Sequence, residues 1–229
     1  MNILAFDTSN NFSSVAISRE NEILYASKAT KPHSQAENLI SMIEEALEST
    51  RLNYGDINYL AVSQGPGSFT GIRIGLAAAK GILLAAPNIR PVCVNNFQMI
   101  NYRVREQYKF FDYAICAVNA YRNQLYIQYY TKKGEDSELL MLSIEEAKIL
   151  INNLSGVKVL GGSGWHLLYD TINYDSKDVV ILPRFAYPDA RFACKIAYQQ
   201  IVQHKVNGNI EPLYIRPPDA KLPKTKLHF

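Results

Sequence analysis

The strongest constraint on the fold is an order of strands and helices that occurs twice along the chain. Each half opens with short runs of strand character and continues with alternating helical and strand segments. The first set of runs lies at residues 2–7, 13–18 and 22–27, and the second set begins at residues 111–118 and 124–131. With 229 residues, of which 48% are apolar, the chain is long enough to bury a core. The order predicts an α/β protein of two lobes, residues 1–103 and 104–229.

The most specific segment is a glycine-rich turn before a helix, GPGSFTGIRIG, which begins at Gly65. The start of a helix after such a turn offers free amides and a partial positive charge, which can bind an anion. A phosphate-binding P-loop requires GxxxxGK[ST], however, and Ile72 stands in the lysine position. The segment therefore predicts a tight turn in which Ser68 or Thr70 caps a helix over residues 70–86.

Two helices carry more apolar surface than one core contact requires. The helix at residues 70–86 is apolar on every side, and its small residues recur every fourth position as a flat strip. A helix over residues 34–50, predicted by the capping box of Ser34 and Glu37, has an apolar arc of roughly 160°, against ~100° for one core-facing stripe.

This surplus suggests an exposed patch kept for a protein partner. The alternative is that the strip packs between the chain's own sheet and a neighbouring helix. The residues expected to face the partner are Leu39, Ile40, Met42, Ile43, Leu47, Gly71, Ile72, Gly75, Leu76 and Ala79.

Few residues point to catalysis. Asp7 ends the first strand, before Thr8 and Ser9, at a corner where a magnesium nucleotide could sit; an Asx turn is the alternative. GGSG at residues 161–164 could pass close to a nucleotide, although a glycine turn that opens a helix is commoner. His33 lies just before a helix cap, where an exposed or capping role is the more common one.

The cysteines and histidines show no metal-ligand spacing. Cys93, Cys116 and Cys194 are odd in number and far apart, which suits reduced, buried thiols. The four histidines form no HExxH pattern, so we expect no metal on this chain.

The net charge of +3 is concentrated at the C-terminal end. Residues 204–229 hold five basic residues against Glu211 and Asp219, which leaves the remainder of the chain neutral. The five are Lys205, Arg216, Lys221, Lys224 and Lys226. Such a basic tail either touches RNA phosphates or is a solvated terminus. No stretch approaches about 18 uninterrupted apolar residues and the start has no basic segment before its apolar run, so we expect a cytoplasmic protein that makes no contact with a membrane.

The chain resembles the TsaB family of bacterial tRNA threonylcarbamoyladenosine proteins. The matching motifs occur in order along almost the whole chain: MNILAFDTS, HSQAENLISMIEEAL, GPGSFTGIRIGLAAAKG, VNAYRNQLYIQYY, GGSGWH and EPLYIR. The resemblance implies the fold of the actin, sugar-kinase and Hsp70 superfamily, with two lobes that each hold a mixed β-sheet and flanking helices.

The resemblance also implies a subunit that is not itself an enzyme. TsaB-like proteins pair with TsaD, which binds metal and nucleotide and transfers a threonylcarbamoyl group to an adenosine of tRNA, and a small ATPase, TsaE, joins the pair. The pairing uses the first two long helices, here residues 34–50 and 70–86. On this basis ATP and metal belong to the partners, and contact with tRNA arises through the complex. Because exposed apolar area is unfavourable, the apolar patch of the same helices also predicts that the chain alone forms a homodimer through them.

One motif departs from the family pattern. Where the family often has Asp-Ala-Arg and then, one residue later, Gly, this chain has Asn119, Ala120, Tyr121 and then Asn123. Asn119 cannot supply the charge that helps to hold a magnesium nucleotide in active members of the superfamily. We therefore expect no more than a vestigial nucleotide site, formed by Asp7, Thr8, Asn119, Gly161 and Gly162. The alternative, which Asp7 favours, is an enzyme in its own right, either an ATP-dependent small-molecule kinase or a peptidase.

Overall fold

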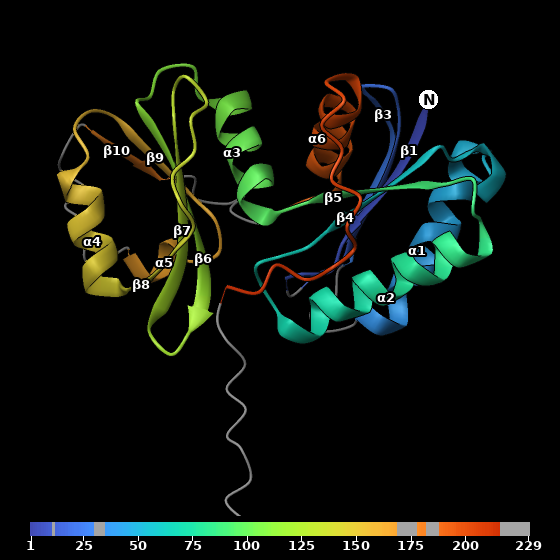
Figure 1. The fold of residues 1–229 in the computed structure, drawn as a ribbon, viewed down its shortest axis with the longest axis horizontal. Coiled ribbons are helices and arrows are strands. Elements are labelled where there is room, and N and C mark those ends of the chain that lie inside the picture. The colour runs from blue at the N-terminus through green and yellow to red at the C-terminus, as the bar shows by residue number, and fades with distance from the viewer. Residues whose placement is uncertain (11, 30–34, 169–177, 182–187, 216–229) are drawn as a thin grey trace, which may run out of the picture.

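The computed structural model shows two lobes, each built on a five-stranded mixed sheet (Figure 1). It describes residues 1–10, 12–29, 35–168, 178–181 and 188–215. His33, Ser34 and most of the basic tail lie outside these ranges, so the expectations about them stay predictions. Within the described ranges, no helix combines the length and the apolar character needed to cross a bilayer.

The two sheets have the same topology, which confirms the predicted repeat of strands and helices. In each, three antiparallel strands form a meander, and two parallel strands follow beside the first strand of that meander. The first sheet has the order β3-β2-β1-β4-β5, with β1 (Asn2–Asp7), β2 (Ser14–Arg19), β3 (Glu22–Lys28), β4 (Tyr59–Ser63) and β5 (Arg90–Val94). The second has the order β10-β9-β6-β7-β8, with β6 (Tyr113–Tyr121), β7 (Gln124–Thr131), β8 (Leu140–Ser143), β9 (Lys158–Gly161) and β10 (Val179–Ile181).

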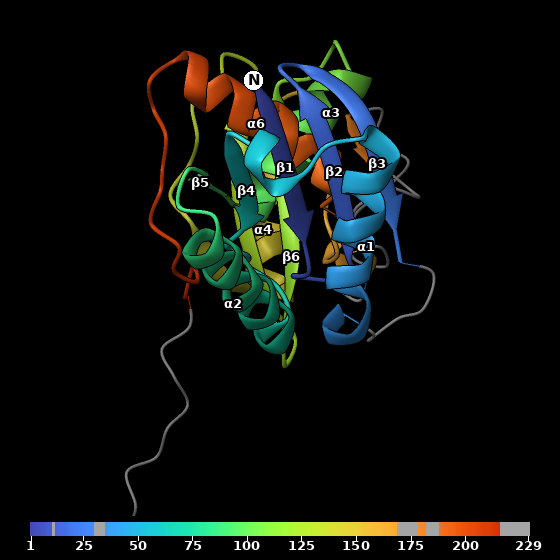
Figure 2. The same ribbon diagram turned by 90° about the vertical axis from the view of Figure 1, so that its right-hand side faces the viewer.

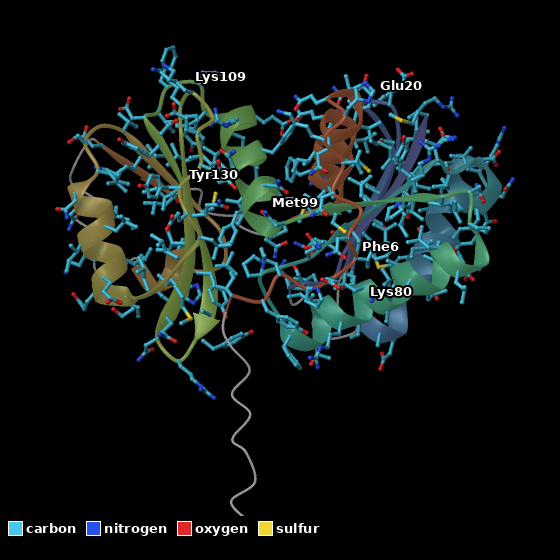
Figure 3. All side chains as sticks on the ribbon, in the orientation of Figure 1. Phe6, Glu20, Lys80, Met99, Lys109 and Tyr130 are labelled. Atoms are coloured by element: carbon cyan, nitrogen blue, oxygen red, sulfur yellow. The ribbon has the colours of Figure 1, made fainter. Side chains whose placement is uncertain are left out.

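Helices cover both faces of the first sheet (Figures 1 and 2). On one face α1 (Gln35–Thr50) and α2 (Phe69–Ala85) lie side by side, with the 3₁₀ turn η1 (Tyr54–Asp56) after α1, and on the other face lies α6 (Ala190–Val202). Phe6 is buried in the core under α1 and α2, whereas Met99 is buried on the side of α6 (Figure 3). Two cores therefore sandwich the first sheet.

The second sheet has α3 (Asn96–Gln107) on the face toward the first lobe and α4 (Ile144–Asn153) with α5 (Trp165–Leu168) on the other (Figure 1). Because α3 contacts both α6 and β6, it connects the two lobes. The predicted division between residues 103 and 104 falls inside this helix.

The chain returns to the first lobe at its C-terminal end. The inner side of α6 consists of small residues, among them Ala193, Cys194 and Ala197, which let the helix lie close to β1 and β2. The sulfur of Cys194 lies 3.8 Å from the carbonyl oxygens of Ile3 and Ala16. The linear division that assigned residues 104–229 to the second lobe therefore does not describe α6, because its Cys194 packs on strand residues 178 and 191 positions earlier in the sequence.

Candidate functional site

The predicted partner-facing residues are mostly internal. Nine of the ten are buried in the chain's own structure, and they are Leu39, Met42, Ile43, Leu47, Gly71, Ile72, Gly75, Leu76 and Ala79. Their apolar side chains fill the space between α1, α2 and the first sheet. The apolar arc of α1 is wide because the helix packs against the sheet and against α2 at once. Only Ile40, at 46% exposure, remains available to a partner.

The glycine strip of α2 lies against the end of β1 rather than against a partner. The hydroxyl of Thr8 donates a hydrogen bond of 2.7 Å to the carbonyl oxygen of Gly71. A Cβ added to Gly71 would collide with the Thr8 carbonyl oxygen, and one added to Gly75 would collide with the Thr8 hydroxyl. The strip therefore permits close helix-to-strand packing, and its assignment to the interface is corrected to the internal alternative.

α1 and α2 still present apolar groups to solvent. Leu84 is 87% exposed, and Ala77 and Gly81, seven and three residues before it, are exposed on the same side of α2. We call Ile40, Ala77, Lys80, Gly81 and Leu84 the outer helix face; Figure 3 labels Lys80 on α2. Beside it α1 exposes four glutamates, Glu37, Glu44, Glu45 and Glu48. α2 thus exposes an apolar strip, and α1 exposes Ile40 together with these glutamates.

The carboxylate of Asp7 is turned into its own turn. Its Oδ1 accepts hydrogen bonds from the backbone N–H and the hydroxyl of Ser9, at 3.1 and 2.6 Å, and its Oδ2 accepts one from the Asn10 amide at 3.1 Å. Asp7 is 1% exposed, and this burial raises the pKa of its carboxyl group. The hydrogen bonds lower the pKa, but by less than burial raises it. This is the Asx turn considered as the alternative to a nucleotide site.

A small cleft of about 260 Å³ separates the two lobes at this level. Its lining comes from both sheets and consists of Ser9, Asn10, Gly67, Ser68, Asn119, Tyr121, Ser163 and His166. None of these is a carboxylate, and the volume is below the ~300–1,000 Å³ usual for ligand pockets. Of the predicted vestigial site only Asn119 reaches the cleft lining, and its side chain accepts a hydrogen bond of 2.7 Å from the N–H of Tyr121.

The other predicted site residues have structural partners. Thr8 is bound to Gly71, as described above. Gly161 lies within β9, paired with Cys116, and Gly162 has a φ of 110° and no room for a Cβ against the Ala117 carbonyl. Ser163 and His166 of the cleft were missed, although Ser163 stands in the GGSG motif and His166 only two residues after it.

The cysteines are free and buried, as predicted. Burial raises the pKa of Cys93 to about 11 and that of Cys194 to about 12, so neither thiol is a nucleophile at neutral pH. The part of the chain that the structure describes holds no cluster of three or more His, Cys, Asp or Glu suited to a metal ion.

Two lobes of equal topology around a cleft define the two-lobe architecture of the actin, sugar-kinase and Hsp70 superfamily. The solved structure of YeaZ from Pseudomonas aeruginosa shares this fold, with a TM-score of 0.78 and 20% identity over 93% of this chain and 99% of that one.

Sequence comparison is more specific. The family model described as "TsaD: tRNA N6-adenosine threonylcarbamoyltransferase" matches residues 25–179. The tRNA threonylcarbamoyladenosine biosynthesis protein TsaB of Escherichia coli (strain K12) is 28% identical over 226 residues, 94% of this chain and 95% of its own length. TsaB of Buchnera aphidicola subsp. Acyrthosiphon pisum (strain APS) is 30% identical over 73% of this chain and 74% of its own length. The chain therefore belongs to this family, and within it to the TsaB proteins.

Proposed function

We propose that this chain is a noncatalytic subunit of tRNA threonylcarbamoyladenosine biosynthesis, which binds TsaD and orders it for threonylcarbamoyl transfer to tRNA. Membership of the TsaB family assigns the chain to this biosynthesis. The observation that carries the finer proposal is the exposure of Leu84 and Ile40 on two neighbouring helices. ATP and metal are then bound by TsaD, TsaE joins the pair, and the complex meets tRNA in the cytoplasm.

The outer helix face is suited to a protein partner because its central residues are apolar or small. Ala77 and Gly81 let a partner helix approach α2 closely, and Leu84 offers a full side chain to a complementary pocket. Burying an exposed leucine contributes about 1.5–3 kcal/mol. The glutamates of α1 favour a basic border on the partner.

Substitution of the outer helix face tests the binding step. We expect Leu84→Asp and Ile40→Asp each to weaken binding of TsaD at least tenfold in calorimetry, because about 1.4 kcal/mol of lost burial corresponds to that factor. Ile149→Asp on α4 is the matched control, since Ile149 is 59% exposed in the second lobe. Wild-type affinity in both outer-face variants would refute the assignment of the interface.

The noncatalytic part of the proposal is supported by the cleft. The described residues that line it include no carboxylate for a magnesium nucleotide, and the carboxylate of Asp7 accepts hydrogen bonds from Ser9 and Asn10 instead. Titration of the isolated chain with magnesium ATP is expected to give no binding heat in the micromolar range. Micromolar binding accompanied by hydrolysis would instead support a stand-alone enzyme.

Without TsaD, the same face should pair with a second copy. Covering exposed apolar area is favourable by about 25 cal/mol per Å², and a surface used by both copies gives a two-fold dimer. We expect light scattering at tens of micromolar to show a dimer for the wild type and a monomer for Leu84→Asp. A wild-type monomer at that concentration would remove the homodimer from the proposal.

A further inference from the structure

We propose that a second pocket between the lobes binds an unstacked nucleotide of single-stranded RNA, an inference that rests on the proposed function in tRNA modification. The pocket has a volume of about 560 Å³ and lies beside the small cleft. We define the aromatic pocket by Phe69, Arg73, Tyr121, Tyr126 and Tyr214 of its lining.

Three segments far apart in the sequence form this pocket. They are the first turn of α2, the hairpin between β6 and β7, and the chain near Tyr214, which meet between the lobes (Figure 1). Phe69, Tyr121 and Tyr214 are each more than half exposed, although large rings usually avoid solvent. Aromatic side chains held open to solvent in a concave site are the platforms on which unpaired bases stack.

Among the described residues of the lining, the only charged one is a cation. The guanidinium of Arg73 lies 3.5 Å from the ring centre of Phe69 and donates hydrogen bonds of 3.3 and 3.1 Å to the hydroxyl of Tyr214. These contacts fix the position of the guanidinium. Because it carries five N–H groups and makes only these two hydrogen bonds to Tyr214, it keeps further N–H groups for a ligand. The nearby carboxylate of Glu211 accepts a hydrogen bond from Asn209 and does not line the pocket. Arg73 can therefore hold a phosphate while a base lies on the rings.

The backbone of the hairpin supports a binding role for Tyr121. Tyr121, Arg122 and Asn123 have positive φ angles of 60°, 53° and 58°, and the strand register shifts between Asn119 and Tyr121. Bulges of this kind re-aim a side chain, and a large residue in the left-handed region is uncommon. The chain keeps a tyrosine at a position that favours glycine or asparagine, and this tyrosine lines the pocket. Such strain is concentrated at ligand sites.

The test measures binding of a fluorescein-labelled hexauridylate RNA to the isolated full chain by anisotropy. Tyr121→Asn removes the ring and keeps a residue that accepts positive φ, and Arg73→Leu removes the charge. We expect each to weaken binding at least fivefold. Arg73→Leu should also reduce the slope of log K against log salt by about 0.7, as expected for one lost phosphate contact. Inorganic phosphate alone should not compete, because the base supplies part of the affinity.

Two control variants remove the same kinds of side chain, a cation and an aromatic ring, outside the aromatic pocket. Arg90→Leu removes an exposed arginine at the start of β5, and Phe110→Ala removes an exposed ring outside the pocket. Both should bind RNA within twofold of the wild type. Absence of RNA binding in the wild type, or equal loss in all four variants, would overturn the proposal.

TsaD binding by Tyr121→Asn separates this inference from the proposed function. We expect wild-type affinity for TsaD. If Tyr121→Asn loses TsaD and the wild type does not bind RNA, the aromatic pocket is a protein contact and the RNA proposal is wrong. If RNA binds as expected but neither the wild type nor any variant binds TsaD, the proposed function is wrong and the RNA-binding role of the pocket is still supported.

Discussion

Gly75 offers the sharpest test of how α2 is packed. An alanine at this position adds one methyl group to a buried helix face, directly against the hydroxyl of Thr8. Thr8 is 2% exposed and β-branched, and its hydroxyl is bound to the Gly71 carbonyl, so it has no easy way to move aside. Gly81 on the same helix is the matched control, because an added Cβ there meets nothing within 4 Å.

The expected effects of the two substitutions have opposite signs. Replacing glycine by alanine inside a helix contributes about 1 kcal/mol of stability through helix propensity alone. At Gly75 this gain is opposed by about 1–3 kcal/mol of overpacking and about 1 kcal/mol for the lost Thr8 hydrogen bond. We therefore expect Gly75→Ala to lower the free energy of unfolding by about 1–3 kcal/mol and Gly81→Ala to raise it by up to about 1 kcal/mol.

Urea unfolding followed by circular dichroism measures both variants. A Thr8→Ala background provides the internal check, because removal of the hydroxyl should make Gly75→Ala much less harmful, as coupling between residues in contact requires. If Gly75→Ala is as stable as Gly81→Ala, the glycine strip does not pack on the end of β1 and is open to a partner instead.

Two further predictions concern ionisable groups. Asp189 caps α6 through its hydrogen bond of 3.0 Å from the Arg191 N–H, so Asp189→Ala should cost about 1 kcal/mol in urea unfolding at pH 7. Burial alone raises the pKa of Asp189, but the hydrogen bonds from Arg191 outweigh it and hold the pKa below its usual value. The share of the wild type's stability advantage over Asp189→Ala that comes from this lowered pKa is therefore present above about pH 4 and should shrink as the pH falls further. The pKa of Asp7 is raised by burial, so the wild type should lose stability relative to Asp7→Asn as the pH rises above about 4. Unfolding curves in which the wild type gains on Asp7→Asn over that range would contradict the raised pKa.

Local signals predicted much of the fold. Ser68 caps α2 by accepting a hydrogen bond from the Gly71 N–H at 3.1 Å, as predicted, and Ser143 with Glu146 forms a capping box at the start of α4. Such signals depend on residues three positions apart, so the sequence contains them directly. The repeated meander was predictable for the same reason, because a short apolar or alternating run of residues marks each of its strands.

The location of the interface could not be predicted in the same way. An apolar arc reports how much of a helix is covered but not what covers it, and the contacts of α1 with α2 and of Gly75 with Thr8 join segments far apart in the sequence. The aromatic pocket was missed for this reason too, since Phe69, Tyr121 and Tyr214 belong to three separate segments.

Reconstituted tRNA modification tests the central claim most directly. A labelled threonylcarbamoyl group is supplied in activated form, and its transfer to tRNA is measured with TsaD and TsaE, in the presence of this chain, of Leu84→Asp, of Ile149→Asp, or of none. We expect full incorporation with the wild type and Ile149→Asp, and almost none with Leu84→Asp or without the chain. Incorporation that proceeds equally well without this chain, or with Leu84→Asp, would contradict a subunit that acts by binding TsaD through the outer helix face.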